Sequence, residues 1–96
     1  MRHRRSKIDL VSQILEAANS DDGATKTKIM YKAYLRDPSL KEYLSILTES
    51  DLLSYALGNN KFKITKKGRK FLDIYDRLFS AMKTQKINVL IDRERT

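Results

Sequence analysis

Apolar residues recur every three or four positions through the first half of the chain, which is the spacing of a helix with one buried face. The first run covers residues 6–19, with Ser6 as the expected N-cap. A shorter run covers residues 25–34. A third run begins at Asp37-Pro38, where we expect Asp37 as the N-cap and Pro38 at the first helical position. The pattern therefore predicts three successive helices.

After Asp51 the period of the apolar residues changes from helical to alternating. On the second of two short predicted strands, Phe62 and Ile64 point one way. Lys61 and Lys63 point the other way, because successive side chains of a strand face opposite sides. A Gly-Asn-Asn turn separates the two strands. The segment therefore predicts a β-hairpin with a basic outer face and tip.

A fourth helix is predicted after Thr65, its expected cap, and it carries a wide apolar stripe. If this helix continued to about Leu90 it would be roughly 35–40 Å long, more than so small a domain can cover. The β-branched segment 87–91 also permits an extended ending. The uncovered part of the stripe predicts a self-complementary dimer interface. Its expected members are Leu72, Tyr75, Leu78, Phe79 and Met82.

The bulk composition narrows the classes of function. Twenty Lys and Arg against twelve Asp and Glu give the 96-residue chain a net charge of +8. This bias favours nucleic acid or an anionic membrane surface as a partner. No run of about eighteen apolar residues is present, so we expect no segment that spans a membrane.

The sequence contains no motif for catalysis and no spacing of ligands for a metal ion. The chain has no cysteine and one histidine, which removes disulfides, thiolate nucleophiles and most zinc sites. No Ser-His-Asp set and no Gly-rich phosphate loop is present. We therefore expect neither an enzyme nor a cofactor nor a bound metal.

The cations are unevenly distributed. An acid-free cluster covers the second predicted strand and the start of the fourth helix: Lys61, Lys63, Lys66, Lys67, Arg69 and Lys70. Helix stability does not explain it, because cations at a helix N-terminus oppose the helix dipole. Contact with phosphates does explain it, since each neutralised phosphate releases condensed counterions. A solubilising surface is the alternative interpretation.

The order of three helices, a hairpin and a further helix resembles a winged helix-turn-helix, and in detail the small archaeal winged-helix transcriptional regulators. The matching segments are IDLVSQIL at 8–15, GATKTKIM at 23–30, LKEYL at 40–44 and FKITKKG at 62–68. The resemblance covers roughly residues 6–80. It implies an α+β, mostly α fold that binds DNA with the third helix in the major groove and the hairpin as the wing. Some members of the family are dimeric chromatin-type proteins joined through a long C-terminal helix.

Two features depart from the pattern of the relatives. Asp51 stands where they commonly have Gly after the third helix, and Asp tolerates the left-handed turn expected there. The recognition face of the third helix carries one Lys and two Glu but no Arg, the commonest reader of guanine. We therefore expect the wing to carry a stronger binding signal than the recognition helix.

The resemblance divides the chain into a flexible basic arm (1–5), a winged-helix domain (6–68), a coiled-coil-like dimerisation helix in the same compact unit (66–90) and a tail (91–96). The candidate DNA contacts are Arg4 and Arg5 in the arm, Lys26, Lys28 and Lys32 on the second helix, Ser39, Lys41 and Ser45 on the third, and Asn59, Asn60, Lys61, Lys63, Lys66 and Lys67 on the wing and after it.

Together these features predict a homodimeric protein that binds double-stranded DNA, either as a transcriptional regulator or as a chromatin-type architectural protein. Its expected location is the cytoplasm, in association with the nucleoid, with no membrane partner; the sequence does not indicate an effector. Two alternatives come from other classes, namely a winged-helix protein-interaction module and an RNA-binding protein.

Overall fold

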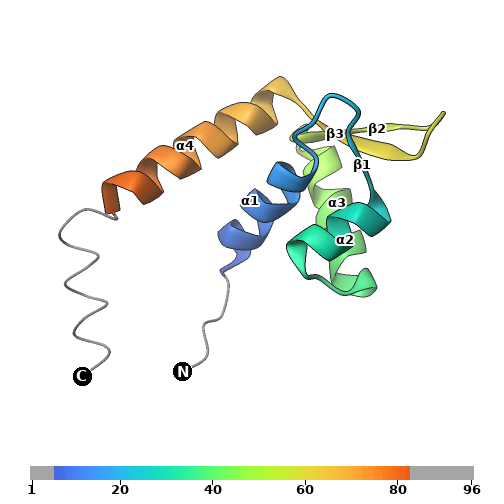
Figure 1. The fold of residues 1–96 in the computed structure, drawn as a ribbon, viewed down its shortest axis with the longest axis horizontal. Coiled ribbons are helices and arrows are strands. Elements are labelled where there is room, and N and C mark those ends of the chain that lie inside the picture. The colour runs from blue at the N-terminus through green and yellow to red at the C-terminus, as the bar shows by residue number, and fades with distance from the viewer. Residues whose placement is uncertain (1–5, 83–96) are drawn as a thin grey trace.

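The computed structural model describes residues 6–82, which form four helices and three strands (Figure 1). Their bounds are α1 Lys7–Ala17, β1 Ala24–Thr25, α2 Lys26–Ala33, α3 Asp37–Glu49, β2 Leu53–Ala56, β3 Lys61–Ile64 and α4 Lys66–Met82. This mostly helical α+β order is that of a winged helix, so the predicted fold class is confirmed. The β2–β3 hairpin is the wing.

Side-chain caps start the first two helices, and the sequence predicted the one at Ser6. The Ser6 hydroxyl accepts a hydrogen bond from the Asp9 N–H at 3.1 Å, and the Asp9 carboxylate accepts one from the Ser6 N–H at 3.2 Å. This reciprocal pair is a capping box. At α2 the Thr25 hydroxyl accepts from the Lys28 N–H at 3.2 Å. Both helices therefore begin where a hydroxyl satisfies an otherwise unpaired backbone donor.

The start of α3 differs from the prediction. Arg36 occupies the N-cap position and makes no side-chain cap bond, so the prediction that Asp37 caps this helix was wrong. Asp37 is instead the first helical residue, and its carboxylate forms an ion pair with the Lys26 ammonium. The reason lies in tertiary structure, because the start of α2 brings that ammonium to the carboxylate. Pro38 is therefore the second helical residue, one position later in the helix than predicted, although it still lies in the first turn.

The sheet has the order β1-β3-β2, with β3 antiparallel to both neighbours. Leu53 lies opposite Ile64, and Ala24 lies opposite Phe62. The sequence did not predict β1, because a strand of two residues is too short to show a period. The predicted left-handed turn before β2 is confirmed by a φ of 62° at Asp51.

The core lies between the helices and one face of the sheet. Its largest fully buried side chains are Ile14, Leu15, Ile29, Leu40 and Leu53. Leu72 of α4 joins this core at 5% exposure. Its predicted place in the dimer interface was therefore wrong. The apolar stripe of α4 begins inside the domain, where α1 and the sheet cover it, and becomes available to a partner only after this point.

The start of α4 packs closely against Leu52, the residue before β2. A Cβ added at Gly68 would lie 2.3 Å from the Leu52 carbonyl oxygen, so this close approach requires a glycine. Figure 1 shows α4 passing over α1 and projecting away from the rest of the domain, on the side opposite the wing tip. The expected continuation of this helix to residue 90 lies outside the described residues after Met82.

Candidate nucleic-acid interface

The exposed side of α3 presents the three side chains predicted for the groove. Ser39, Lys41 and Ser45 are all exposed. Lys41 and Ser45 line a shallow hollow of about 480 Å³ together with Pro38, Glu42, Ile46 and Glu49. The Lys41 ammonium and the Glu42 and Glu49 carboxylates therefore face the solvent there. Their net negative charge repels phosphates, so this side of the helix is better suited to contact base edges.

Ile46 is a surface residue that sequence reasoning missed. Its side chain is 52% exposed, although an isoleucine in a helix is usually assigned to the core. Its spacing of four residues from Glu42 and three from Glu49 was the available signal, because these spacings place all three on one side of the helix. An apolar group here can contact the methyl group of thymine in a major groove.

The three candidate lysines of α2 do not form one patch. Lys26 is paired with Asp37 and lines a hollow beside the wing. Lys32 lines a different hollow with Gln13 and Glu16 of α1. Lys28 lines a third hollow, described next. The three lysines are therefore not arranged to contact one continuous stretch of DNA backbone along α2.

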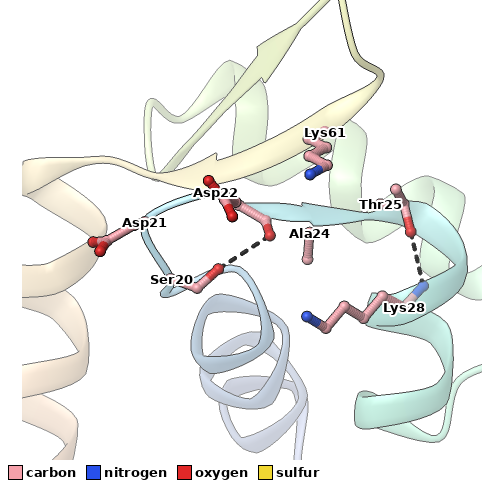
Figure 2. A pocket seen from close by; sticks show the side chains of 8 residues that line it. Ser20, Asp21, Asp22, Ala24, Thr25, Lys28 and Lys61 are labelled. Atoms are coloured by element: carbon pink, nitrogen blue, oxygen red, sulfur yellow. Dashed lines mark hydrogen bonds between the residues drawn. The ribbon is translucent and has the colours of Figure 1, made fainter.

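Lys28 and Lys61 line the same hollow from either side of β1 (Figure 2). Figure 2 shows the Lys61 side chain leaving β3 and the Lys28 side chain leaving α2, both toward β1. They line a hollow of about 400 Å³ together with the turn that carries Asp21 and Asp22. The Ser20 hydroxyl donates to the Gly23 carbonyl at 3.0 Å and stabilises this turn. Two carboxylates offset the two ammonium groups, so this hollow is only a weak site for a phosphate.

The outer face of the wing is basic. Lys61 and Lys63 lie opposite Ala56 and Ser54 across the hairpin, so all four share the face turned away from the core. Lys63 is exposed and Lys61 is half-buried. The second strand of the hairpin thus has one apolar side and one basic side, as the sequence predicts. Both lysines are carried by β3, which pairs with β2 along its whole length.

The first turn of α4 continues this basic surface. Thr65 caps the helix by accepting a hydrogen bond from the Gly68 N–H at 2.9 Å, as predicted. Lys66 and Lys67 are exposed, and so are Arg69 and Lys70. The Lys67 ammonium also donates to the Ser50 carbonyl at 3.0 Å, at the end of α3. Lys67 therefore has a structural role in addition to its charge.

The wing tip carries Asn59 and Asn60, both exposed. The Asn59 carboxamide oxygen accepts from the Lys61 N–H at 3.2 Å, and the Asn60 carboxamide oxygen accepts from the Tyr55 hydroxyl at 2.7 Å. Asn60 adopts a left-handed φ of 56°, which Asn tolerates better than most residues. The tip therefore has a defined shape.

The outer half of α4 presents an apolar face. Leu78 and Phe79, both predicted interface residues, are 59% and 47% exposed. Ile74 is 58% exposed on the same side and was missed, although its spacing of four residues from Leu78 was the signal. The side chain of Met82 lies outside the described part of the chain.

Tyr75 divides its contacts between α1 and this apolar face. Its ring stacks on Phe79 with centroids 5.4 Å apart, and its hydroxyl donates to the Asp9 carboxylate. That hydrogen bond, followed by those from the backbone and side chain of Ser6, holds the pKa of Asp9 below its ordinary value. The same bond to Asp9 raises the pKa of Tyr75. A charged hydrogen bond thus fixes α4 to the start of α1.

The described residues were predicted to include neither a metal site nor a membrane span, whereas part of the predicted DNA contact lies outside them. Arg4 and Arg5, the predicted contacts of the arm, lie outside that range. Residues 6–82 contain no group of three or more His, Cys, Asp or Glu that could hold a metal ion. Within the same range, no helix is long and apolar enough to cross a membrane.

Comparison with known proteins agrees with the architecture. A family model described as winged helix-turn-helix matches residues 4–83, most of the chain. No curated protein matches the sequence. Domains of the matching family are typically non-enzymatic DNA-binding domains, which agrees with the lack of a catalytic constellation in the sequence.

Proposed function

We propose that the chain, which belongs to the winged helix-turn-helix family, binds double-stranded DNA. The observation that carries the proposal is the basic surface of the wing and α4. It is formed by the outer face of the wing and the first turn of α4, where six cations occur between Asp51 and Asp73 without an intervening acid. Phosphates are the partners that this surface fits, because their neutralisation releases counterions and gives salt-dependent affinity.

The helix α3 is the element proposed to enter the major groove, with Ser39, Lys41 and Ser45 toward the base edges. Two glutamates on the same side repel nearby phosphates and accept hydrogen bonds from only some bases. We therefore expect affinity to come from the basic surface, while α3 contributes register and modest selectivity. A protein that binds DNA in this way would be associated with the nucleoid in the cytoplasm.

We also propose that two copies pair through the outer half of α4. Ile74, Leu78 and Phe79 expose apolar surface on one side of a helix that projects from its own domain (Figure 1). Contiguous apolar surface of this kind marks an interface, and a two-fold contact lets the same patch serve both copies. The dimer would set the spacing between two DNA half-sites.

Light scattering after gel filtration tests the dimer. We expect twice the chain mass of 11.2 kDa for the unchanged protein and a monomer for Leu78→Asp, which buries a charge in the interface. Ser80→Asp is the matched control. It adds the same charge two residues later, about 200° around the helix. A monomeric unchanged protein, or equal behaviour of both variants, would contradict pairing through this face.

A duplex titration on random and genomic fragments tests the function. Selective footprints would identify a regulator, while even coating would identify a chromatin-type protein. A parallel competition between duplex DNA and RNA of the same length tests the partner class. Binding that is tighter for RNA, or absent for both, would contradict the proposal.

A further inference from the structure

The hollow between α2 and the turn before β1 contains charges of both signs that do not pair with each other. Asp21 and Asp22 line it from the turn, while Lys28 and Lys61 line it from α2 and β3. Within residues 6–82, none of these four side chains takes part in an ion pair. The positive and negative groups are therefore held in one hollow but remain apart.

The opposite charges occupy different parts of the hollow. In Figure 2 the Asp22 side chain lies at the turn, whereas the ends of the Lys28 and Lys61 side chains lie on opposite sides of Ala24. Figure 2 also shows the Asp21 side chain pointing away from both lysines. The hollow thus has a carboxylate at one end and two ammonium groups at the other.

The backbone that carries Asp22 is fixed by its own contacts. The Ser20 hydroxyl donates to the Gly23 carbonyl at 3.0 Å, and the Gly23 N–H donates to the Ser20 carbonyl at 3.1 Å. Gly23 has a left-handed φ of 77°, and a Cβ added there would lie 2.5 Å from the Phe62 carbonyl oxygen. The turn is therefore closed on itself and seated against β3, so a ligand of Asp22 meets backbone that is already ordered.

The positive end of the hollow also offers a hydroxyl. Thr25 lines the hollow, and its side-chain oxygen accepts a hydrogen bond from the Lys28 N–H at 3.2 Å. A hydroxyl has one proton to donate in addition to its acceptor sites. A carboxylate at this end can therefore receive hydrogen bonds from two ammonium groups and one hydroxyl.

The arrangement selects for a ligand that carries both charges and has no net charge. A phosphate or another simple anion would be repelled by the Asp22 carboxylate, and a metal cation would be repelled by the two ammonium groups. An amino acid in its zwitterionic form satisfies both ends, because charge-assisted hydrogen bonds then form to its carboxylate and from its ammonium. The volume of about 400 Å³ is enough for a small amino acid.

We propose that this hollow binds a small amino acid. Its carboxylate accepts hydrogen bonds from Lys28, Lys61 and Thr25, and its ammonium donates to Asp22. Lys61 also belongs to the basic surface proposed for DNA, so the bound carboxylate neutralises one of the six cations of that surface. The amino acid is thus an effector that weakens duplex binding, a consequence that rests on the proposed function.

Nuclear magnetic resonance with glycine as the probe tests the site on the protein alone. Glycine titrated into the ¹⁵N-labelled chain should shift the backbone amides of residues 20–25, Lys28 and Lys61. Because the charged groups are largely exposed, we expect a dissociation constant on the order of 1 mM. Sodium acetate and methylammonium chloride each carry one of the two charges and should bind about tenfold more weakly. Equal shifts with either of them, or shifts outside the hollow, would overturn the site.

Variants locate glycine at the two ends of the hollow. Asp22→Asn removes the partner of the ligand ammonium, and Lys28→Gln removes one partner of its carboxylate. Each should weaken glycine binding about fivefold. Asp76→Asn and Lys7→Gln make the same changes at exposed positions of α4 and α1 and are the controls. Unchanged glycine affinity in both hollow variants, or an equal loss in the controls, would overturn the assignment.

A duplex titration with and without saturating glycine tests the regulatory consequence. Glycine should weaken duplex binding by the unchanged protein about threefold. The glycine concentration at half effect should be about fivefold higher for Asp22→Asn, in step with its weaker glycine binding. Equal duplex affinity with the hollow filled and empty would overturn the role as an effector. A chain that binds glycine but no duplex would contradict the proposed function and leave the amino-acid site in place.

Discussion

The exposed side of α3 and the basic surface of the wing and α4 contrast in charge. The first sets one lysine against two glutamates in the same hollow. The second contains six cations in a stretch of sequence without an acid. A helix that is expected to read bases is thus less suited to hold phosphates than the elements beside it. Under the proposed function, affinity and orientation would therefore arise on different elements.

The two regions are nevertheless joined mechanically. The Lys67 ammonium bonds to the Ser50 carbonyl where α3 ends. The Thr65 hydroxyl donates to the Asp51 carbonyl at 2.6 Å while also capping α4. Phosphates bound by the basic surface, as proposed, would therefore constrain where α3 can lie.

The largest effect is expected from reversing charge on the wing. Lys61→Glu combined with Lys63→Glu should weaken duplex binding on the order of 100-fold at moderate salt, because two attractive contacts become repulsive. Fluorescence anisotropy with a labelled duplex measures this loss. Lys7→Glu combined with Arg77→Glu changes the net charge equally, away from the wing. A similar loss in this control would reduce the contrast to a matter of total charge.

A smaller effect of opposite sign is expected on α3. Glu42→Gln combined with Glu49→Gln removes two carboxylates that repel phosphates, so affinity for any duplex should rise by roughly threefold. The same anisotropy titration, repeated on several sequences, checks this. If affinity fell on one sequence alone, those glutamates would be reading bases, and α3 would have a larger role in selectivity than we assign to it.

The smallest effect concerns the joint between α1 and α4. Tyr75→Phe removes the hydroxyl that bonds to Asp9 and should lower the free energy of unfolding by about 1 kcal/mol at pH 7. The pKa of Asp9 lies below its ordinary value of 3.8 in the folded chain. The stabilisation is therefore complete above that value and is lost as the pH falls through the lower folded pKa.

Urea denaturation from pH 7 to pH 2.5 measures this dependence. The difference between the two proteins should shrink at the acid end, while duplex affinity at neutral pH stays unchanged. A difference that does not vary with pH would mean that the hydroxyl acts through packing and not through the carboxylate. A change in affinity would mean that the joint positions the basic surface.

Much of the fold was predictable because it depends on local signals. The helical repeat, the Ser6 and Thr65 hydroxyls and the alternation around Phe62 each act within a few residues. The two-residue β1 was not predictable, because its only reason to be extended is its pairing with β3. Likewise the ion pair of Asp37 with Lys26 joins two helices, and no spacing within either one reveals it.

The sequence predicted which charged residues the candidate site contains, but not how they are arranged in space. Lysines at 26, 28 and 32 look alike in the sequence, yet they line three separate hollows. The burial of Leu72 and the exposure of Ile74 depend on how far α1 covers α4. The orientation of the tip amides depends on donors from Lys61 and Tyr55, which only the closed hairpin brings to them.

The salt dependence of duplex binding is the decisive test of whether the basic surface contacts phosphates. The dissociation constant of the unchanged protein on a mixed-sequence duplex would be measured over a range of salt concentrations. We predict a slope of log affinity against log salt of about −4 to −5, which corresponds to most of the six cations of the basic surface meeting phosphates. A slope near zero would contradict it.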